Sequence, residues 1–167
     1  LLKENLSARR FTSLGVGGTC RHVVELDHPE DLPPTLEWAK HHGFEVLFLG
    51  EGTNVLIADS GFSGLVLLNR IRGRTRRAEV VTVASGESLF DLIRWLNQQE
   101  LGGMERMYGI PGTLGGALVG NAGAYGQEIA DSVLEIEAVG PCGPTLLSKE
   151  NLQFRYRNSI LKDFPEL

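Results

Sequence analysis

The chain has 167 residues, of which 42 % are hydrophobic and 22 % charged, and its formal net charge is −5. This balance is typical of a globular protein and argues against disordered, fibrous, nucleic-acid-binding and membrane-binding classes, and no segment has the pattern of a signal peptide or a membrane span. The two cysteines, Cys20 and Cys142, lie far apart, which indicates free thiols in a reducing cytosol rather than a zinc site or a disulfide framework.

The first predicted elements are a strand and a helix. The β-branched run RHVVEL, residues 21–26, is typical of a strand. Leu32, Leu36 and Ala39 then share one face of a helix, and Gly43 is a suitable C-terminal stop. Two prolines fit the first turn of this helix.

Three further strands are predicted in the first half of the chain. The apolar run EVLFLG, residues 45–50, is typical of a strand that is buried on both faces. The segment VLIAD, residues 55–59, and the segment LVLLN, residues 65–69, follow as strands on either side of a turn at SGFSG. The predicted order is therefore strand, helix, strand, strand, strand.

The run RIRGRTRR, residues 70–77, contains five arginines in eight residues. It fits either a basic patch that binds phosphates or an alternation of charge at the tip of a hairpin. The second interpretation is favoured because the rest of the chain is acidic.

The second half begins with a strand in EVVTVASG, residues 79–86, and then a helix. Ser88 is its predicted N-cap, Asp91 occupies the N3 position, and Gly102 closes it. The apolar positions recur at helical spacing: Leu89, Leu92, Ile93 and Leu96. The run SVLEIEAVG, residues 132–140, predicts another strand, which a turn at GPCGP connects to TLLS.

The segment LGEGTNVLIAD places Gly50 and Gly52 directly after a predicted strand. Glycine permits positive φ and allows a ligand to reach backbone N–H groups, and successive N–H groups can bind an anion such as a pyrophosphate. Thr53 and Asn54 add side-chain donors. A Rossmann fingerprint is excluded because its third glycine is missing and because the next predicted element is a strand and not a helix. A P-loop is excluded because no G-K-[ST] occurs in the chain. An ordinary tight turn remains the alternative.

The segment GIPGTLGGALVGNAGAYG, residues 109–126, contains seven glycines in eighteen residues. In a helix or strand each glycine costs roughly 0.5–1 kcal/mol relative to alanine. Their number favours a backbone that lies against a planar cofactor with a diphosphate tail, with Asn121 as a hydrogen-bond partner. Contact between a helix and a sheet of the protein itself is the alternative.

Three segments together resemble a known family. LGEGTNVLIAD, YGIPGTLGGALVGNAGAYGQEI and FRYRNSILK, in this order, resemble the UDP-N-acetylenolpyruvoylglucosamine reductase (MurB) family, and FTSLGVGG resembles its opening segment. The resemblance covers nearly the whole chain. It implies an α+β fold, the two-lobed FAD-binding fold of the p-cresol methylhydroxylase (PCMH) type, with residues 1–75 and 76–167 as the two lobes.

The resemblance also implies a reaction. NADPH reduces FAD, and the reduced flavin passes hydride to UDP-N-acetylglucosamine enolpyruvate, which gives UDP-N-acetylmuramate for peptidoglycan in the bacterial cytoplasm. Because neither glycine-rich segment contains histidine or cysteine, FAD is expected to be held without a covalent bond. Nucleic-acid partners, membrane partners and metals are not expected.

The family motifs assign site residues to this sequence. Those expected to bind the cofactor are Gly50, Glu51, Gly52, Thr53, Asn54, Val55, Leu56, Ile57, Ile110, Pro111, Gly112, Thr113, Gly115, Gly116, Asn121, Ala122, Gly123 and Ala124. Arg157, in YRNS, matches the active-site arginine, whose planar fork suits a carboxylate and whose charge favours enolate character. Tyr125 and Tyr156 either face the substrate or simply pack within the protein.

The sequence departs from the family in one respect. The proton-donor serine, in a GSxFKNP-like segment, and a later glutamate have no match, because Ser132 and Ser159 do not fit the motif. The C-terminal substrate-binding domain is therefore expected to be missing from this chain, and the chain alone is expected to be inactive. The alternatives are another flavin-dependent oxidase or dehydrogenase of the same fold and a catalytically incompetent FAD-binding module.

Overall fold

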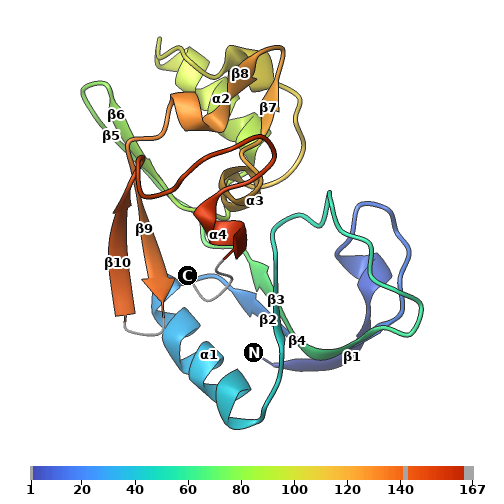
Figure 1. Ribbon diagram of the computed structural model, residues 1–167. Helices are drawn as coiled ribbons and strands as arrows, with labels where there is room; N and C mark the ends of the chain where they lie inside the picture. The colour runs from blue at the N-terminus through green and yellow to red at the C-terminus, as the bar shows by residue number, and fades with distance from the viewer. Residues whose placement is uncertain (1, 141–142, 164–167) are drawn as a thin grey trace. The chain divides into compact units, whose positions relative to one another are not determined.

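The computed structural model describes residues 2–140 and 143–163 (Figure 1). The chain divides into two compact units, Leu1–Gly73 and Arg74–Leu167. None of the helices within the described ranges is long and apolar enough to cross a membrane. Cys20 is a buried free thiol, whereas Cys142 and part of the predicted turn at 140–144 lie outside the described residues.

The first unit is built on a four-stranded sheet with the order β1-β2-β4-β3, to which α1 and two short 3-10 helices are added. The β1–β2 pair is antiparallel, and β4 is parallel to both β2 and β3. The bounds are β1 Lys3–Ser7, η1 Ala8–Arg10, β2 Thr19–Leu26, η2 Pro29–Asp31, α1 Leu32–His41, β3 Val46–Leu49 and β4 Phe62–Asn69.

The central strand β4 is the one that is buried on both faces. Leu65 and Leu67 lie in a cluster with Ala39 of α1, and Val66 and Leu68 lie in a second cluster with Phe11. The alternation follows from the period of two along a strand. The predicted strand at 21–26, the helix and the strand at 65–69 are thus confirmed.

Other expectations for this unit were wrong. Residues 55–59 form no strand, and β4 pairs with β2 on one side and β3 on the other. The strand β3 is an edge strand, with Phe48 43 % exposed, so it is not buried on both faces. Residues 62–64 belong to β4 rather than to a turn, and the polar strand β1 was not predicted.

The second unit contains short hairpins and helices. Its strands are β5 Arg74–Arg77, β6 Val80–Val83, β7 Gly123–Ala124, β8 Gln127–Glu128, β9 Glu135–Gly140 and β10 Gly143–Ser148, which pair as three antiparallel hairpins. Its helices are α2 Leu89–Gln98, η3 Glu105–Met107, α3 Leu114–Val119, η4 Ile129–Asp131 and α4 Ile160–Asp163.

Helix α2 forms as its sequence predicts at the start. Ser88 Oγ accepts a hydrogen bond from the Asp91 N–H at 3.3 Å. The four predicted apolar positions are buried in one cluster with Met107 and Ile129. The helix ends earlier than predicted, at Gln98, where the Leu101 N–H bonds the Leu96 carbonyl and Glu100 adopts a left-handed φ of 57°. Gly102 is therefore not its stop.

The arginine run forms β5 of a hairpin and is largely used to hold α2. Arg74 Nη1 donates to the Asp91 carbonyl at 3.2 Å, and its guanidinium carbon lies 5.3 Å from the centre of the Trp95 ring. Arg76 Nη1 donates to the Gln99 carbonyl at 2.9 Å, just beyond the end of α2. The expected hairpin is present, but the arginines do not form its tip: Arg74, Arg76 and Arg77 lie along β5, and Arg70 and Arg72 precede it.

Candidate functional site

The first glycine loop, residues 50–57, follows β3 and is fixed by its carbonyl groups. The Gly50 carbonyl accepts from Arg70 Nη1 at 3.0 Å, and the Gly52 carbonyl accepts from the Ser13 N–H at 3.0 Å. Gly52 has a φ of 63°, and a Cβ at this position would lie 2.2 Å from the Phe11 carbonyl oxygen. The segment that contains Phe11 and Ser13 therefore packs directly on this loop and requires glycine there.

The backbone N–H groups of this loop remain available to a ligand. Within residues 2–140 and 143–163, six of them donate to no other residue: Glu51, Gly52, Asn54, Val55, Leu56 and Ile57. Leu56 is also 71 % exposed. A run of unengaged amides beside an exposed apolar side chain fits the phosphate-bearing part of a nucleotide cofactor.

The second glycine-rich segment behaves differently at α3. Leu114 N–H and Gly115 N–H donate to the carbonyls of Glu87 and Ser85, at 2.8 and 2.7 Å, and Gly116 N–H donates to Thr113 Oγ1 at 3.3 Å. A Cβ on Gly115 would lie 3.1 Å from atoms of Ser85. At this point the backbone contacts residues 85–87 of the protein itself, so the amides of Gly115 and Gly116 are engaged internally.

The turn before α3 offers two amides instead. The N–H groups of Gly112 and Thr113 make no hydrogen bond within the described part of the chain. Gly112 has a φ of 118°, which favours glycine. Ile110 N–H bonds the Met107 carbonyl, and Pro111 has no N–H to offer. Among the expected cofactor residues of this turn, Gly112 and Thr113 are thus the available donors.

Asn121 is an internal residue. The residue has 1 % of its surface exposed to solvent. Its Nδ2 donates to Glu128 Oε2 at 2.8 Å and to the Arg155 carbonyl at 3.0 Å. Its Oδ1 accepts from the Ala130 N–H at 3.4 Å. Both amide hydrogens are thus donated within the protein, and the expected role of Asn121 toward a cofactor stays a prediction.

A cavity of about 260 Å³ brings together the residues expected at the reaction centre. It is lined by Asn121, Gly123, Ala124, Tyr125, Gly126, Gln127, Glu128, Tyr156 and Arg157. Tyr125 and Tyr156 are 86 % and 84 % exposed, so they do not pack in the core. Gly126, Gln127 and Glu128 were not among the predicted residues, although they follow Tyr125 directly in the sequence.

Arg157 enters this cavity with its guanidinium unengaged. It makes no ion pair or hydrogen bond with any residue that the structure describes, and its guanidinium carbon lies 5.9 Å from the centre of the Tyr156 ring. Three lining residues other than glycine have left-handed φ angles, namely Asn121 (42°), Tyr125 (52°) and Arg157 (55°). Such conformations are uncommon and cluster at functional sites.

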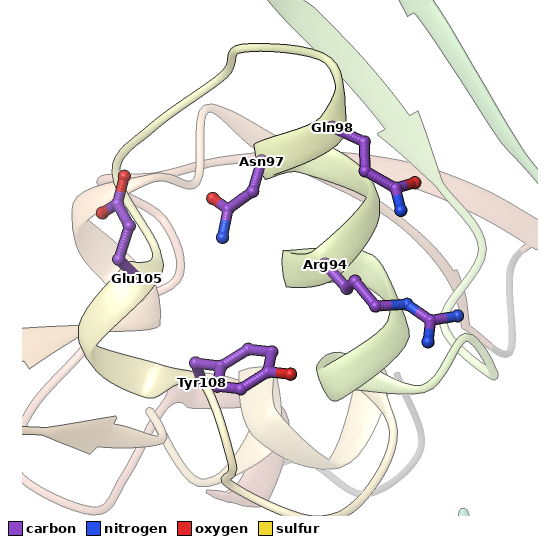
Figure 2. A pocket seen from close by; sticks show the side chains of 5 residues that line it. All are labelled: Arg94, Asn97, Gln98, Glu105 and Tyr108. Carbon is purple, nitrogen blue, oxygen red and sulfur yellow. The ribbon is translucent and has the colours of Figure 1, made fainter.

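A second cavity, of about 520 Å³, contains none of the predicted site residues (Figure 2). It is lined by Arg94, Asn97 and Gln98 of α2 and by Glu105 and Tyr108, and Figure 2 shows Asn97 pointing toward the space between Glu105 and Tyr108. Arg94 pairs with Asp91 at 3.5 Å, and hydrogen bonds from the Glu105 and Gly103 backbone N–H groups lower the pKa of the Glu105 carboxyl. These charged groups already have partners. No group of three or more metal-ligating side chains occurs among the described residues.

Residues 20–146 match the model of the FAD binding domain family. The chain belongs to this family. A relative from Synechococcus elongatus, named UDP-N-acetylenolpyruvoylglucosamine reductase, is 40 % identical over 164 residues, which are 96 % of this chain and 54 % of the relative. A relative of the same name from Acaryochloris marina is 38 % identical, over 99 % of this chain and 55 % of its own length. The chain thus spans about half the length of the curated relatives it matches.

The solved structures agree with this assignment. The crystal structure of UDP-N-acetylenolpyruvylglucosamine reductase (MurB) from Thermus caldophilus is 28 % identical with a TM-score of 0.82, over 95 % of this chain and 57 % of that one. Cholesterol oxidase from B. sterolicum, at 19 % identity and a TM-score of 0.57 over 77 % of this chain and 29 % of that one, shares the fold. The predicted α+β FAD-binding fold of the PCMH type is confirmed, and FAD is the cofactor of the family.

Proposed function

We propose that the protein reduces UDP-N-acetylglucosamine enolpyruvate to UDP-N-acetylmuramate with NADPH, for peptidoglycan synthesis in the bacterial cytoplasm, and that this chain supplies the FAD-binding part. The observation that carries the proposal is the unengaged Arg157 guanidinium in a cavity with Tyr125 and Tyr156. The relatives that bear the reductase name support it.

The residues present fit FAD at two places, one in each compact unit. The unengaged amides of the first glycine loop suit the pyrophosphate, and the amides of Gly112 and Thr113 suit polar atoms of the same cofactor. In this proposal the units Leu1–Gly73 and Arg74–Leu167 are the two FAD-binding lobes. When bound, FAD supplies the hydride chemistry between NADPH and the substrate.

Arg157 is the proposed catalytic residue of this chain. Its planar fork binds a carboxylate at two points, and the substrate class carries one carboxylate on its enolpyruvyl group. The same charge stabilises the negative charge that develops on that carboxylate during reduction. The exposed rings of Tyr125 and Tyr156 offer apolar faces with polar tips beside it, which suits contact with substrate.

The test uses the full-length protein, because the relatives are about twice as long as this chain. Arg157→Lys retains the charge but removes the fork. We expect kcat/KM for the enolpyruvyl sugar to fall by about 100- to 1,000-fold, the range for loss of one transition-state donor. Reduction of the flavin by NADPH alone should persist. The matched control is Arg77→Lys, because Arg77 is an exposed arginine of the same unit whose guanidinium makes no hydrogen bond or ion pair among the described residues.

The alternatives give other results. A different flavin oxidase or dehydrogenase of this fold would bind FAD but oxidise NADPH without dependence on the enolpyruvyl sugar. A catalytically incompetent module would bind FAD and turn over neither substrate. If the full-length protein shows no flavin absorbance after expression and reconstitution, the proposal fails altogether.

A further inference from the structure

We propose that Asn121 is a positioning residue that sets the place of Arg157 by holding the turn on which Arg157 sits. The inference rests on the proposed function, because it assigns Arg157 its catalytic role. It differs from direct donation by the Asn121 side chain to a ligand, because both amide hydrogens of that side chain are donated within the protein.

Arg157 lies at the tip of a two-residue turn. The Arg155 N–H donates to the Asn158 carbonyl at 2.9 Å and the Asn158 N–H donates to the Arg155 carbonyl at 3.0 Å, which leaves Tyr156 and Arg157 between them. Both tip side chains are exposed, and the Arg157 guanidinium makes no hydrogen bond or ion pair among the residues described; its one printed contact is with the ring of Tyr156 in the same turn. The position of that guanidinium therefore depends on the backbone of the turn.

The base of the turn is attached to the end of α3 by two hydrogen bonds. Asn121 Nδ2 donates to the Arg155 carbonyl at 3.0 Å, and Ser159 Oγ donates to the Val119 carbonyl at 3.0 Å. Asn121 and Ser159 are both buried, and α4, which begins at Ile160, contacts α3 (Figure 1). Both bonds thus run between residues 119–121 and the base of the turn.

The same carboxamide also reaches the other side of the cavity. Its second hydrogen is donated to Glu128 Oε2, and the Ala130 N–H donates to its Oδ1. Glu128 and Asp131 in turn bond each other's backbone N–H groups as a capping box. One buried side chain therefore ties the Arg157 turn to the segment that contains Glu128, and both segments line the cavity.

The test begins with a readout that needs no substrate. In the full-length protein, Asn121→Ser shortens the side chain and removes the donor to Arg155. We expect hydrogen exchange at the N–H groups of Arg155 and Asn158 to accelerate by about tenfold, the factor that corresponds to one hydrogen bond of ordinary strength. The control Asn97→Ser changes an exposed asparagine on α2 and should leave this exchange unchanged.

The second readout is a double-mutant cycle on the proposed reaction. If Asn121 acts through Arg157, then Asn121→Ser lowers kcat/KM by about tenfold in the wild type but has no further effect in an Arg157→Lys background. Flavin absorbance should stay at the wild-type value in each variant, which checks that FAD is still bound. Additive losses, or unchanged exchange at Arg155 and Asn158, would overturn the positioning role.

Two outcomes separate this inference from the proposed function. If the wild type lacks activity toward the enolpyruvyl sugar, the proposed function fails, while the exchange measurement still decides whether Asn121 holds the turn. If Asn121→Ser does not fold, Glu128→Gln provides a second variant, because the glutamine Oε1 still accepts from Asn121. That variant should retain wild-type exchange at Arg155, and faster exchange would contradict the inference.

Discussion

Arg70 Nη1 donates a hydrogen bond to the carbonyl oxygen of Gly50 at 3.0 Å, which connects the end of β4 to the first residue of the first glycine loop. Because the Gly50 carbonyl is hydrogen-bonded within the protein, the unengaged N–H groups of the loop residues that follow it stay available to a ligand. The bond therefore orders the loop before a ligand arrives, and preorganisation of this kind increases affinity.

Removal of this bond should weaken FAD binding. Arg70→Met keeps the apolar stem of the side chain and loses the donor, so we expect an increase in the FAD Kd of about five- to tenfold, the value of one ordinary hydrogen bond. Quenching of flavin fluorescence in the full-length protein measures it. Arg77→Met is the control: it also removes one positive charge, but from an arginine whose guanidinium makes no hydrogen bond or ion pair among the described residues, and it should leave the Kd as it is.

Gly52 and Gly43 form a matched pair for the close packing of the loop. Both have left-handed φ angles, of 63° and 67°, but a Cβ on Gly43 meets nothing within 4 Å, whereas one on Gly52 meets the Phe11 carbonyl. Gly43→Ala should cost about 1 kcal/mol of stability and leave FAD affinity unchanged. Gly52→Ala should cost more and lower FAD occupancy as well, as measured by thermal unfolding and by the flavin-to-protein absorbance ratio. Equal effects would contradict the role of Phe11.

The N-cap of α2 is predicted to stabilise the second unit. Ser88→Ala removes the bond from Asp91 N–H and should lower the free energy of unfolding by about 1 kcal/mol. Asp31, the N-cap residue of α1, makes no such bond, so Asp31→Ala should cost only about 0.3 kcal/mol. Urea unfolding followed at Trp95 for the first variant, and at Trp38 for the second, assigns each effect to its own helix.

Glu105 should make stability depend on pH in the acidic range. Backbone N–H groups of Glu105 and Gly103 hold the pKa of its carboxyl below the ordinary value of 4.5. A pKa that is lowered by folding stabilises the protein above the unfolded-state value, and this contribution disappears as the pH falls from 4.5 through the lower, folded-state value. The effect should be small because the carboxyl is exposed.

The measurement for Glu105 is the urea midpoint between pH 7 and pH 3. Glu105→Gln should give a shallower decline below pH about 4.5 than the wild type. Glu79→Gln, at the exposed tip of the β5–β6 hairpin, is the control and should follow the wild-type curve. A Glu105→Gln curve parallel to that of the wild type would show that the backbone bonds contribute nothing.

Features that depend on local sequence were predictable. The Ser88 cap and the apolar spacing of α2 determine that helix within one segment, and both are confirmed. The strand predicted at 55–59 does not form, although the order β1-β2-β4-β3 leaves β1 and β3 as edge strands. No pattern within those five residues reports on pairing, which is a property of segments distant in the sequence.

In the candidate site, too, features set by a local motif could be predicted, whereas those that depend on distant segments could not. The segments around Gly50, Gly112 and Arg157 could be found from their motifs, and the structure brings Tyr125, Tyr156 and Arg157 to one cavity. The role of Asn121 could not be found, because its two acceptors come from residues 128 and 155. Nor could the sequence show that Gly115 packs against Ser85, since a glycine needed for internal packing looks the same in a sequence as one needed for a ligand.

The hairpin that covers α2 changes how the run RIRGRTRR interacts with polyanions. Arg70, Arg74 and Arg76 already donate to carbonyl oxygens, and Arg72 also has a partner. Arg77 alone has an unengaged guanidinium in this run, so far as the described residues show. A nucleic acid that bound this run could therefore form a two-point contact between a phosphate and one guanidinium, that of Arg77, instead of five. Such binding would release few of the counterions condensed on the nucleic acid.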